Sequence, residues 1–347
     1  MDKYFAASNS AQGFLSYYNE CFSPCDKIYI IKGGPGTGKS SLMKRVAKDA
    51  EERFYYVEYF YCSSDPESLD GIIIYKGDKR IAILDGTAPH VYDTVYPGVR
   101  DNIINLGEAW DDGVLERSRE RILELCRKKT HAYRRAYAVL GLCGNLSVVI
   151  DSYFDEVILH SKVSSAAEKL SWRYSACGKG TEEIRLIDSV SMKGRVRFDT
   201  LEAKAKETVV VGDIYGSGHI FLGKIREELN RRRSDIYISF DPIIPRRING
   251  IFDKGSGVAY ILADPRVEPK CENINYVNIK RFIGDGIRDF KKDLKYSYTL
   301  YKNSVELALK HLDTANKLHF ELEDIYKGAM DFSIVDRKTV ELVQKIL

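Results

Sequence analysis

The residues best suited to chemistry in this chain form a glycine-rich loop that ends in lysine and serine. The loop matches the pattern G-x-x-x-x-G-K-[ST] at every fixed position. Its backbone N–H groups and the start of the following helix would face phosphate groups, and glycine is needed where backbone approaches a ligand closely. The pattern therefore predicts nucleoside triphosphate binding. The candidate binding residues are Gly33, Gly34, Pro35, Gly36, Thr37, Gly38, Lys39, Ser40 and Ser41.

The flanking sequence supplies the elements that would hold this loop. Residues 27–31 form an apolar run typical of a buried strand, and residues 41–47 place apolar side chains at helical spacing. We expect the Lys39 ammonium to reach the β- and γ-phosphates and the Ser40 hydroxyl to bind Mg²⁺. No Asn-Lys-x-Asp sequence for reading guanine occurs in the chain. The expected cofactors are therefore ATP and Mg²⁺.

Hydrolysis also needs an acidic group near the Mg²⁺ and a group that orients the attacking oxygen. The apolar run 81–84 ends in Asp85, which is a candidate Mg²⁺ ligand acting through water. Gly86 stands where many ATPases carry a catalytic glutamate. In the turn that follows, His90 or Thr87 could orient water or could simply belong to a loop. The catalytic candidates are Lys39, Asp85 and His90, and the metal candidates are Ser40 and Asp85.

The two halves of the sequence repeat the same landmarks in the same order. Gly216-Ser217-Gly218 follows Gly36-Thr37-Gly38 by 180 residues, and Leu262-Ala263-Asp264 follows Ile83-Leu84-Asp85 by 179 residues. Such a repeat indicates a duplicated unit. We expect an α/β fold made of two tandem P-loop NTPase domains with parallel sheets flanked by helices, covering residues 1–180 and 181–347.

The second loop lacks the residues that the first would use. His219 and Ile220 stand at the positions of Lys39 and Ser40, and Asp213 stands at the position of Gly33. A short imidazole does not replace a flexible ammonium, and isoleucine offers Mg²⁺ no oxygen. We therefore expect a degenerate, inactive second site, serving either as a packing scaffold or as a regulatory pocket.

Each half also carries heptad-like apolar spacing that predicts long helices. In the first half it runs over about 114–178 and is interrupted at Gly141–Asn145, which predicts a helical hairpin. In the second half it runs over about 286–347. These segments either project as arms, which could engage an unidentified protein partner, or pack along the sheets.

Composition limits the other classes of function. The chain has 347 residues, with 53 lysines and arginines against 50 acidic residues, so its net charge favours neither nucleic acid nor a membrane surface. The N-terminus lacks a signal-peptide pattern, and we expect a cytoplasmic protein with no membrane span. Arg231–Arg233 and Arg246–Arg247 are interpreted as solvated surface, although they could bind nucleic acid or offer an arginine to the first site.

With Phe5-Ala6, the loop 32–41 and the run 83–90 in view, the chain resembles a family of uncharacterised bacterial tandem P-loop proteins, usually labelled ATPases or ATP-binding proteins. The resemblance covers nearly the whole chain and is stronger in the first half. It implies a P-loop in both halves, a pattern from which His219 and Ile220 depart. The leading expectation is a slow ATPase. A nucleotide-state sensor, or a small-molecule kinase with an acceptor near Asp65, remains an alternative.

Overall fold

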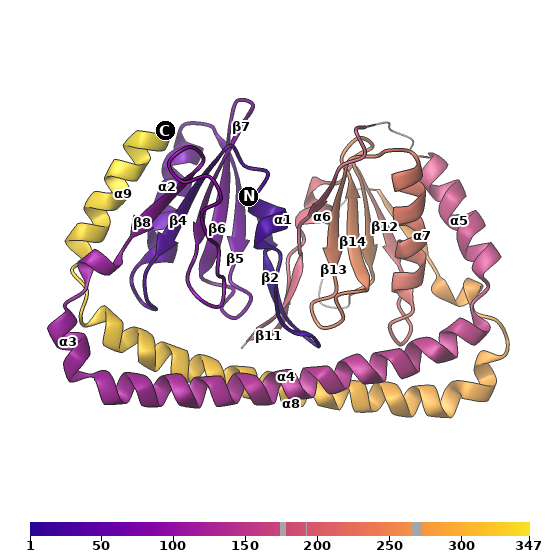
Figure 1. The fold of residues 1–347 in the computed structure, drawn as a ribbon. Coiled ribbons are helices and arrows are strands. Elements are labelled where there is room, and N and C mark those ends of the chain that lie inside the picture. Colours follow the sequence, from indigo (N-terminus) through magenta and orange to yellow (C-terminus); the bar gives the residue numbers. More distant parts are fainter. Residues whose placement is uncertain (174–177, 192, 265–272) are drawn as a thin grey trace.

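A computed structural model describes residues 1–173, 178–191, 193–264 and 273–347. It contains two six-stranded sheets, each mixed but mostly parallel and each flanked by helices. The two sheets stand side by side above a pair of very long helices (Figure 1). The α/β class expected from the sequence is therefore confirmed.

The first sheet has the strand order β1-β5-β6-β7-β4-β8. Only β6 runs antiparallel to its neighbours; the other pairs are parallel. Ile28, Ile30 and Ile31 of β4 are all fully buried, as expected for a parallel strand covered on both faces. The strands are β1 (Asp2–Phe5), β4 (Lys27–Lys32), β5 (Tyr56–Tyr61), β6 (Leu69–Lys76), β7 (Lys79–Asp85) and β8 (Asp101–Asn105).

The second sheet repeats this topology. Its order is β9-β13-β14-β15-β12-β16, and only β14 is antiparallel to its neighbours. The strands are β9 (Glu182–Ile184), β12 (Glu207–Val211), β13 (Ile236–Phe240), β14 (Ile248–Asp253), β15 (Val258–Leu262) and β16 (Ile274–Val277). Each sheet is accompanied by a small hairpin, β2 (Ala7–Ser10) with β3 (Gly13–Ser16), and β10 (Asp188–Ser191) with β11 (Gly194–Arg197).

Two helices are exchanged between the halves. Helix α5 (His160–Arg173) belongs to the first half of the sequence but packs on α7 (Gly218–Arg231) of the second. Helix α9 (Phe332–Ile346) ends the chain but packs on α2 (Lys39–Glu52) of the first half. The apolar face of α9 completes the core beneath the first sheet through Val335, Leu342, Val343 and Ile346.

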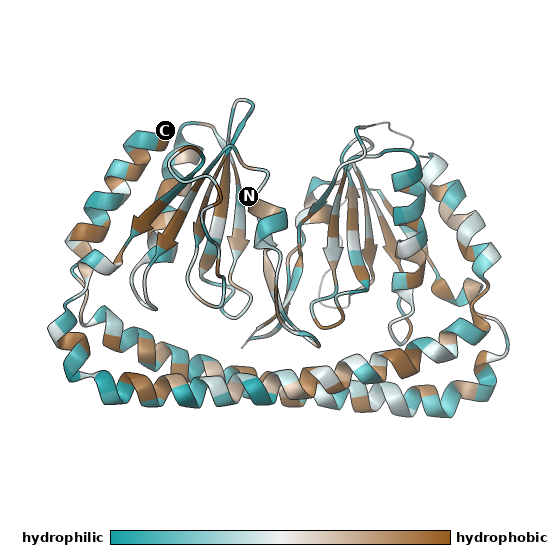
Figure 2. Cartoon of the chain, viewed as in Figure 1, coloured by the Kyte–Doolittle hydropathy of each residue, from teal (hydrophilic) through white to brown (hydrophobic). Residues whose placement is uncertain are grey.

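The exchange is made by α4 (Arg119–Val157, 39 residues) and α8 (Ile287–Lys327, 41 residues). The two helices lie antiparallel, as the backbone bridges at their ends show. Trp110, before α4, pairs with Met330, after α8, and Ile158, after α4, pairs with Ile283, before α8. We call this pair the rod. It runs beneath both sheets in Figure 1. Figure 2 shows apolar residues concentrated in the strands and distributed in patches along the rod.

The predicted hairpin in residues 114–178 is wrong, and so is the expectation of projecting arms. Gly141 and Gly144 lie inside α4 and do not end it. A side chain at Gly144 would come within 2.9 Å of the Ala11 Cβ at the tip of the β2–β3 hairpin. Gly144 therefore allows the turn of the β2–β3 hairpin to approach the rod, at a cost of about 1 kcal/mol in helix propensity.

Short helices complete the fold: α1 (Tyr18–Phe22), η1 (Gly107–Ala109), α3 (Asp112–Arg117), α6 (Thr200–Lys204) and η2 (Ile279–Phe282).

Helix α4 is also the one helix in the described ranges that is long and apolar enough, by length and composition, to cross a membrane. The expectation of a chain without a membrane span is not tested by this finding. A single such helix is weak evidence, because a helix packed inside a protein passes the same test. Here α4 pairs with α8.

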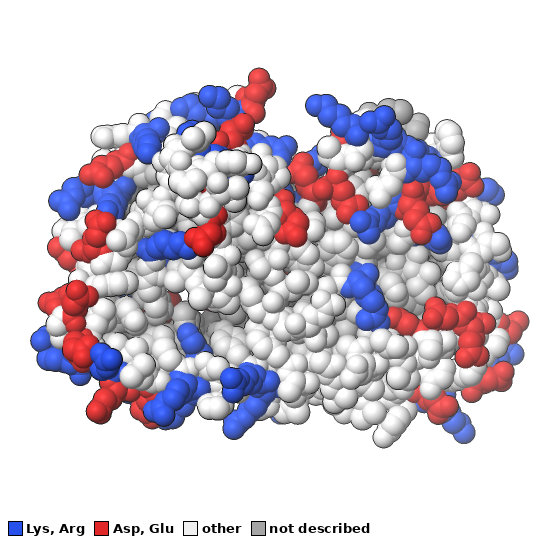
Figure 3. Space-filling model, viewed as in Figure 1, with Lys and Arg blue, Asp and Glu red and all other residues white. Residues whose placement is uncertain are grey.

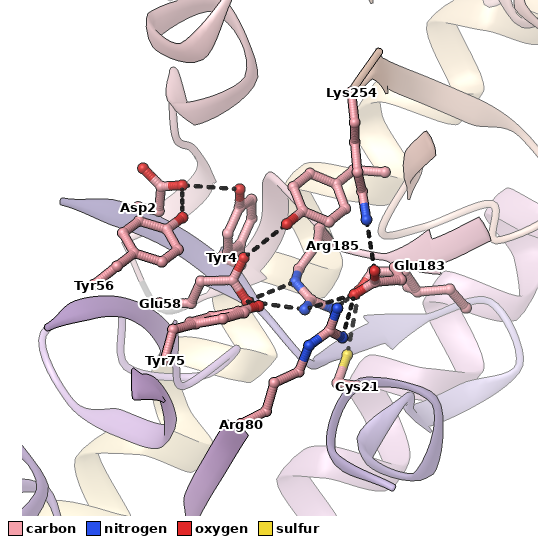
Figure 4. A network of polar contacts seen from close by, with 12 residues as sticks. Asp2, Tyr4, Cys21, Tyr56, Glu58, Tyr75, Arg80, Glu183, Arg185 and Lys254 are labelled. Carbon is pink, nitrogen blue, oxygen red and sulfur yellow. Dashed lines mark hydrogen bonds and ion pairs between the residues drawn. The ribbon is translucent and has the colours of Figure 1, made fainter. Parts of the chain in front are cut away.

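A buried polar network joins the two sheets (Figure 4). The Arg185 guanidinium, 1% exposed, lies 2.8 Å from the Glu58 carboxylate, which is fully buried. Tyr75 and Tyr237 donate hydrogen bonds to the same carboxylate at 3.1 and 3.2 Å. Burial acts to lower the pKa of Arg185, but the net shift is well upward because Glu58 stabilises its charge. The first and second halves are thus held together by a fully desolvated ion pair.

Candidate functional site

The Gly33–Ser40 loop connects β4 to α2 as the sequence predicted. Gly36 and Gly38 have φ angles of +69° and +86°, a left-handed region that favours glycine. Gly38 is the N-cap residue of α2, so the helix begins at Lys39. The strand, turn and helix start that a phosphate-binding loop requires are therefore all present.

Lys39 and Asp85 face each other at the mouth of this loop. The Lys39 ammonium lies 3.5 Å from the Asp85 carboxylate and donates to the backbone carbonyls of Gly33 at 3.2 Å and Gly34 at 2.5 Å. Both side chains are largely buried. They meet because β4 and β7 are parallel neighbours in which Ile31 pairs with Asp85, so both strands end at the same edge of the sheet.

The turn after β7 is tied to the same loop. The Thr87 backbone N–H donates to Asp85 at 2.8 Å, and its hydroxyl donates to the Gly33 carbonyl at 3.0 Å. The Ser40 hydroxyl accepts a hydrogen bond from the Leu69 backbone N–H at 2.9 Å. The predicted metal ligands Ser40 and Asp85 thus lie on the same edge of the first sheet as Lys39. Their oxygen donors suit Mg²⁺.

His90 occupies a different position from the one expected. Its Nε2 lies 3.2 Å from the carboxylate of Asp70, and both side chains are buried. The Tyr18 ring stacks on the imidazole at 5.0 Å between centroids, which fixes its plane. His90 therefore contacts Asp70 and has no hydrogen bond or ion pair to Lys39 or Asp85 within the described part of the chain.

Asp70 is a further candidate residue, which sequence reasoning did not single out. It stands at the start of β6, which lies between β5 and β7 in the sheet. The pKa of Asp70 is raised, mainly by burial and further by the charge of Asp85, whereas His90 and Lys39 act to lower it. Gly71, the next residue of β6, pairs with Leu84, the residue before Asp85, so Asp70 lies near the end of β7 that carries Asp85. The only feature of the sequence that could have pointed to Asp70 is an aspartate at the start of an apolar strand.

Cys62 joins His90 and Asp70 in a second group of possible ligands. The three side chains place their donor atoms within 4.8 Å of one another. A sulfur, an oxygen and a nitrogen suit a borderline metal such as Zn²⁺ better than Mg²⁺. Burial raises the pKa of the Cys62 thiol well above its ordinary value, so the thiol is neutral and its hydrogen bond stabilises the Asp70 carboxylate.

The end of the rod covers the Gly33–Ser40 loop, which the sequence did not predict. A Cβ atom built on Gly34 would lie 2.9 Å from the Tyr326 ring, and one on Gly36 would lie 2.6 Å from the backbone carbonyl oxygen of Glu323. The space beside Gly38 is filled by Val335 of α9 at 3.4 Å. Close packing therefore favours glycine at positions 34 and 36, and a positive φ angle favours it at positions 36 and 38.

The matching loop of the second half is filled by its own side chains. The Asp213 carboxylate accepts hydrogen bonds from the backbone N–H groups of Gly218 at 2.7 Å and Gly216 at 3.2 Å. Nδ1 of His219 lies 2.7 Å from the Gly216 carbonyl oxygen. The N–H groups that would face a phosphate are therefore engaged by a carboxylate of the same charge sign.

The second-half arginines do not reach the first site. Arg246 and Arg247 both form ion pairs with Asp151 of α4, beneath the second sheet. Arg232 lies over the Trp172 ring at 4.2 Å from its centroid. The hypothesis that one of these runs supplies an arginine to the first half is not supported. On the face shown in Figure 3, basic and acidic side chains are interspersed over both sheets.

Comparison with known proteins adds no family: no family model, curated protein or solved structure matches the chain.

Proposed function

We propose that the protein binds Mg²⁺–ATP at the Gly33–Ser41 loop and hydrolyses it slowly. The observation that carries this proposal is the approach of Lys39 to Asp85 at 3.5 Å, at the mouth of a glycine loop that opens a helix. A lysine, an acidic strand end and a helix N-terminus at one edge of a sheet are the parts from which triphosphate sites are built.

Each residue then has a defined role. Lys39 would leave its own loop carbonyls and contact the β- and γ-phosphates, while Ser40 and Asp85 would hold Mg²⁺. The metal ion, when bound, would neutralise charge that develops on the phosphates. We assign the general base to Asp70, because the pairing of Gly71 with Leu84 brings it near Asp85 and because Gly86 offers no glutamate. His90 is a positioning residue that orients Asp70.

We also propose that the two halves arose from a tandem duplication and that both are P-loop NTPase domains. The identical strand order and the single antiparallel strand at the same place in each sheet support this proposal. In the second half, the Asp213 carboxylate accepts hydrogen bonds from the backbone N–H groups that would otherwise face a phosphate, so that half serves as a scaffold. The resemblance to the bacterial tandem P-loop family points the same way.

A non-hydrolysing nucleotide sensor is the second candidate. The packing of α8 and α9 against the Gly33–Ser40 loop favours this candidate, because a nucleotide bound in the loop would change the contacts between the loop and these helices. A sensor must bind ATP and change its contacts with α8 and α9, but it needs no general base.

Phosphate release under single-turnover conditions separates the two candidates. Asp70→Asn should slow Mg²⁺-dependent release by about 10²-fold while ATP binding persists, because it removes the proton acceptor. The matched control is Asp78→Asn, an exposed aspartate in the turn at the far end of β6. Tight ATP binding without release by the wild type would favour the sensor, and absence of binding would overturn both candidates.

A further inference from the structure

We propose that Lys129 of α4 and His319 of α8 contact the terminal phosphate of the bound nucleotide, so that the rod distinguishes ATP from ADP. This inference rests on the proposed ATP site. Neither residue is in the Gly33–Ser40 loop, and neither was expected from the sequence.

Helix α8 contacts the first sheet at two points. The Asn316 amide donates to the Ser64 carbonyl, after β5, at 3.1 Å. At Glu323, the α8 backbone lies against Gly36, after β4. His319 falls between these two contacts on the same helix face, because residues three and seven positions apart share a face. The two contacts are about 10 Å apart along the helix.

The strands beneath that interval carry the proposed chemistry. In the sheet order, β6 and β7 lie between β5 and β4, and they bear Asp70 and Asp85. His319 is therefore held above the edge at which these carboxylates and Lys39 meet. Lys39 is among the charges that influence His319.

Helix α4 contacts the same sheet as well. Tyr133 places its hydroxyl 3.4 Å from the Ser64 hydroxyl, so this stretch of α4 also faces the sheet edge. Lys129 is one turn earlier on the same face and is only partly exposed. Within the described ranges no ion pair joins the Lys129 ammonium to a carboxylate, and burial lowers its pKa.

Charge then identifies the ligand. Burial and the nearby charges of Lys129, Lys39 and Lys327 lower the pKa of His319, while Glu323, whose carboxylate lies 3.5 Å from His319 Nε2, acts to raise it. Glu323 is already shared with Lys327 at 3.2 Å. Lys129 is a partly buried cation that no ion pair joins to a carboxylate in the described ranges, so it needs an anion. The phosphate that Lys39 would bind is the anion available there, and the His319 imidazole would donate a hydrogen bond to the same phosphate. The γ-phosphate extends furthest from the loop, so these groups should distinguish ATP from ADP.

The test compares ATP and ADP affinities by isothermal titration of the full chain with Mg²⁺. Lys129→Gln and His319→Gln should each weaken ATP binding by about tenfold and change ADP binding less than about twofold, because the lost contact is to the γ-phosphate. Lys128→Gln is the matched control, since this exposed neighbour pairs with Glu124 on its own helix and should change neither affinity.

The outcomes are distinct. An equal loss for ATP and ADP would mean a structural effect and would overturn the inference, as would unchanged affinities in both variants. Absence of nucleotide binding by the wild type would instead overturn the proposed function and this inference with it. Circular dichroism of each variant verifies that a loss of affinity does not come from unfolding.

Discussion

Replacing Lys39 by alanine should lower the affinity for ATP by about 10- to 100-fold and abolish phosphate release. The substitution removes a charge-assisted hydrogen bond to phosphate, which is worth about 1.5–3 kcal/mol. It also leaves Asp85 facing the nucleotide without the ammonium that lies 3.5 Å away. Titration calorimetry and a phosphate-release assay measure the two effects.

Lys44→Ala provides the comparison for Lys39. Lys44 lies on the same helix, but its ammonium donates to the Glu67 carbonyl on the exposed surface. Its loss should leave both nucleotide affinity and phosphate release near the wild-type values. Equal behaviour of the two alanine variants would show that Lys39 does not contact phosphate, and would remove the loop from the account.

Replacing Arg185 by methionine should destabilise the protein by about 3–5 kcal/mol, because the substitution leaves a buried charge without its partner. Glu58 is fully buried, and the two hydrogen bonds from Tyr75 and Tyr237 do not replace the lost positive charge. Chemical denaturation followed by circular dichroism measures the free energy of unfolding. The effect should appear in both halves, because the pair lies between their sheets.

Two further variants test this interpretation. Arg80→Met removes a partly exposed ion pair with Glu183 in the same network and should cost no more than about 1 kcal/mol. Replacing both Arg185 and Glu58 by methionine should restore most of the stability lost in Arg185→Met. A double variant less stable than Arg185→Met would contradict the assignment of the loss to an unpaired carboxylate.

Local patterns predicted the centre of the candidate site. The loop, the strand before it and the helix after it depend on neighbouring residues, and the pairing of β4 with β7 placed Asp85 beside Lys39. The substitution of Asp213 for Gly33 also indicated a blocked second loop. In the structure, the Asp213 carboxylate itself accepts the hydrogen bonds of the backbone N–H groups in that loop.

The exchange of helices could not be predicted, because heptad spacing specifies an apolar face but not its partner. Residues Gly141 and Gly144 suggested a break, yet both lie inside α4, and Gly144 allows the close approach of Ala11, which is distant in sequence. Asp70 was missed for the same reason. The role that we propose for it depends on β6 lying antiparallel beside β7, and nothing in the sequence around Asp70 indicates that placement.

The most direct test of the account is a titration of the wild-type protein with ATP in the presence of Mg²⁺. The two halves share one strand order, so two binding sites are conceivable, but we predict that one nucleotide binds per chain. We also predict no binding at the same ATP concentrations when Mg²⁺ is chelated. Two nucleotides per chain would show that the Asp213 carboxylate does not block the second loop. No binding at all would contradict the assignment of the Gly33–Ser41 loop as an ATP site.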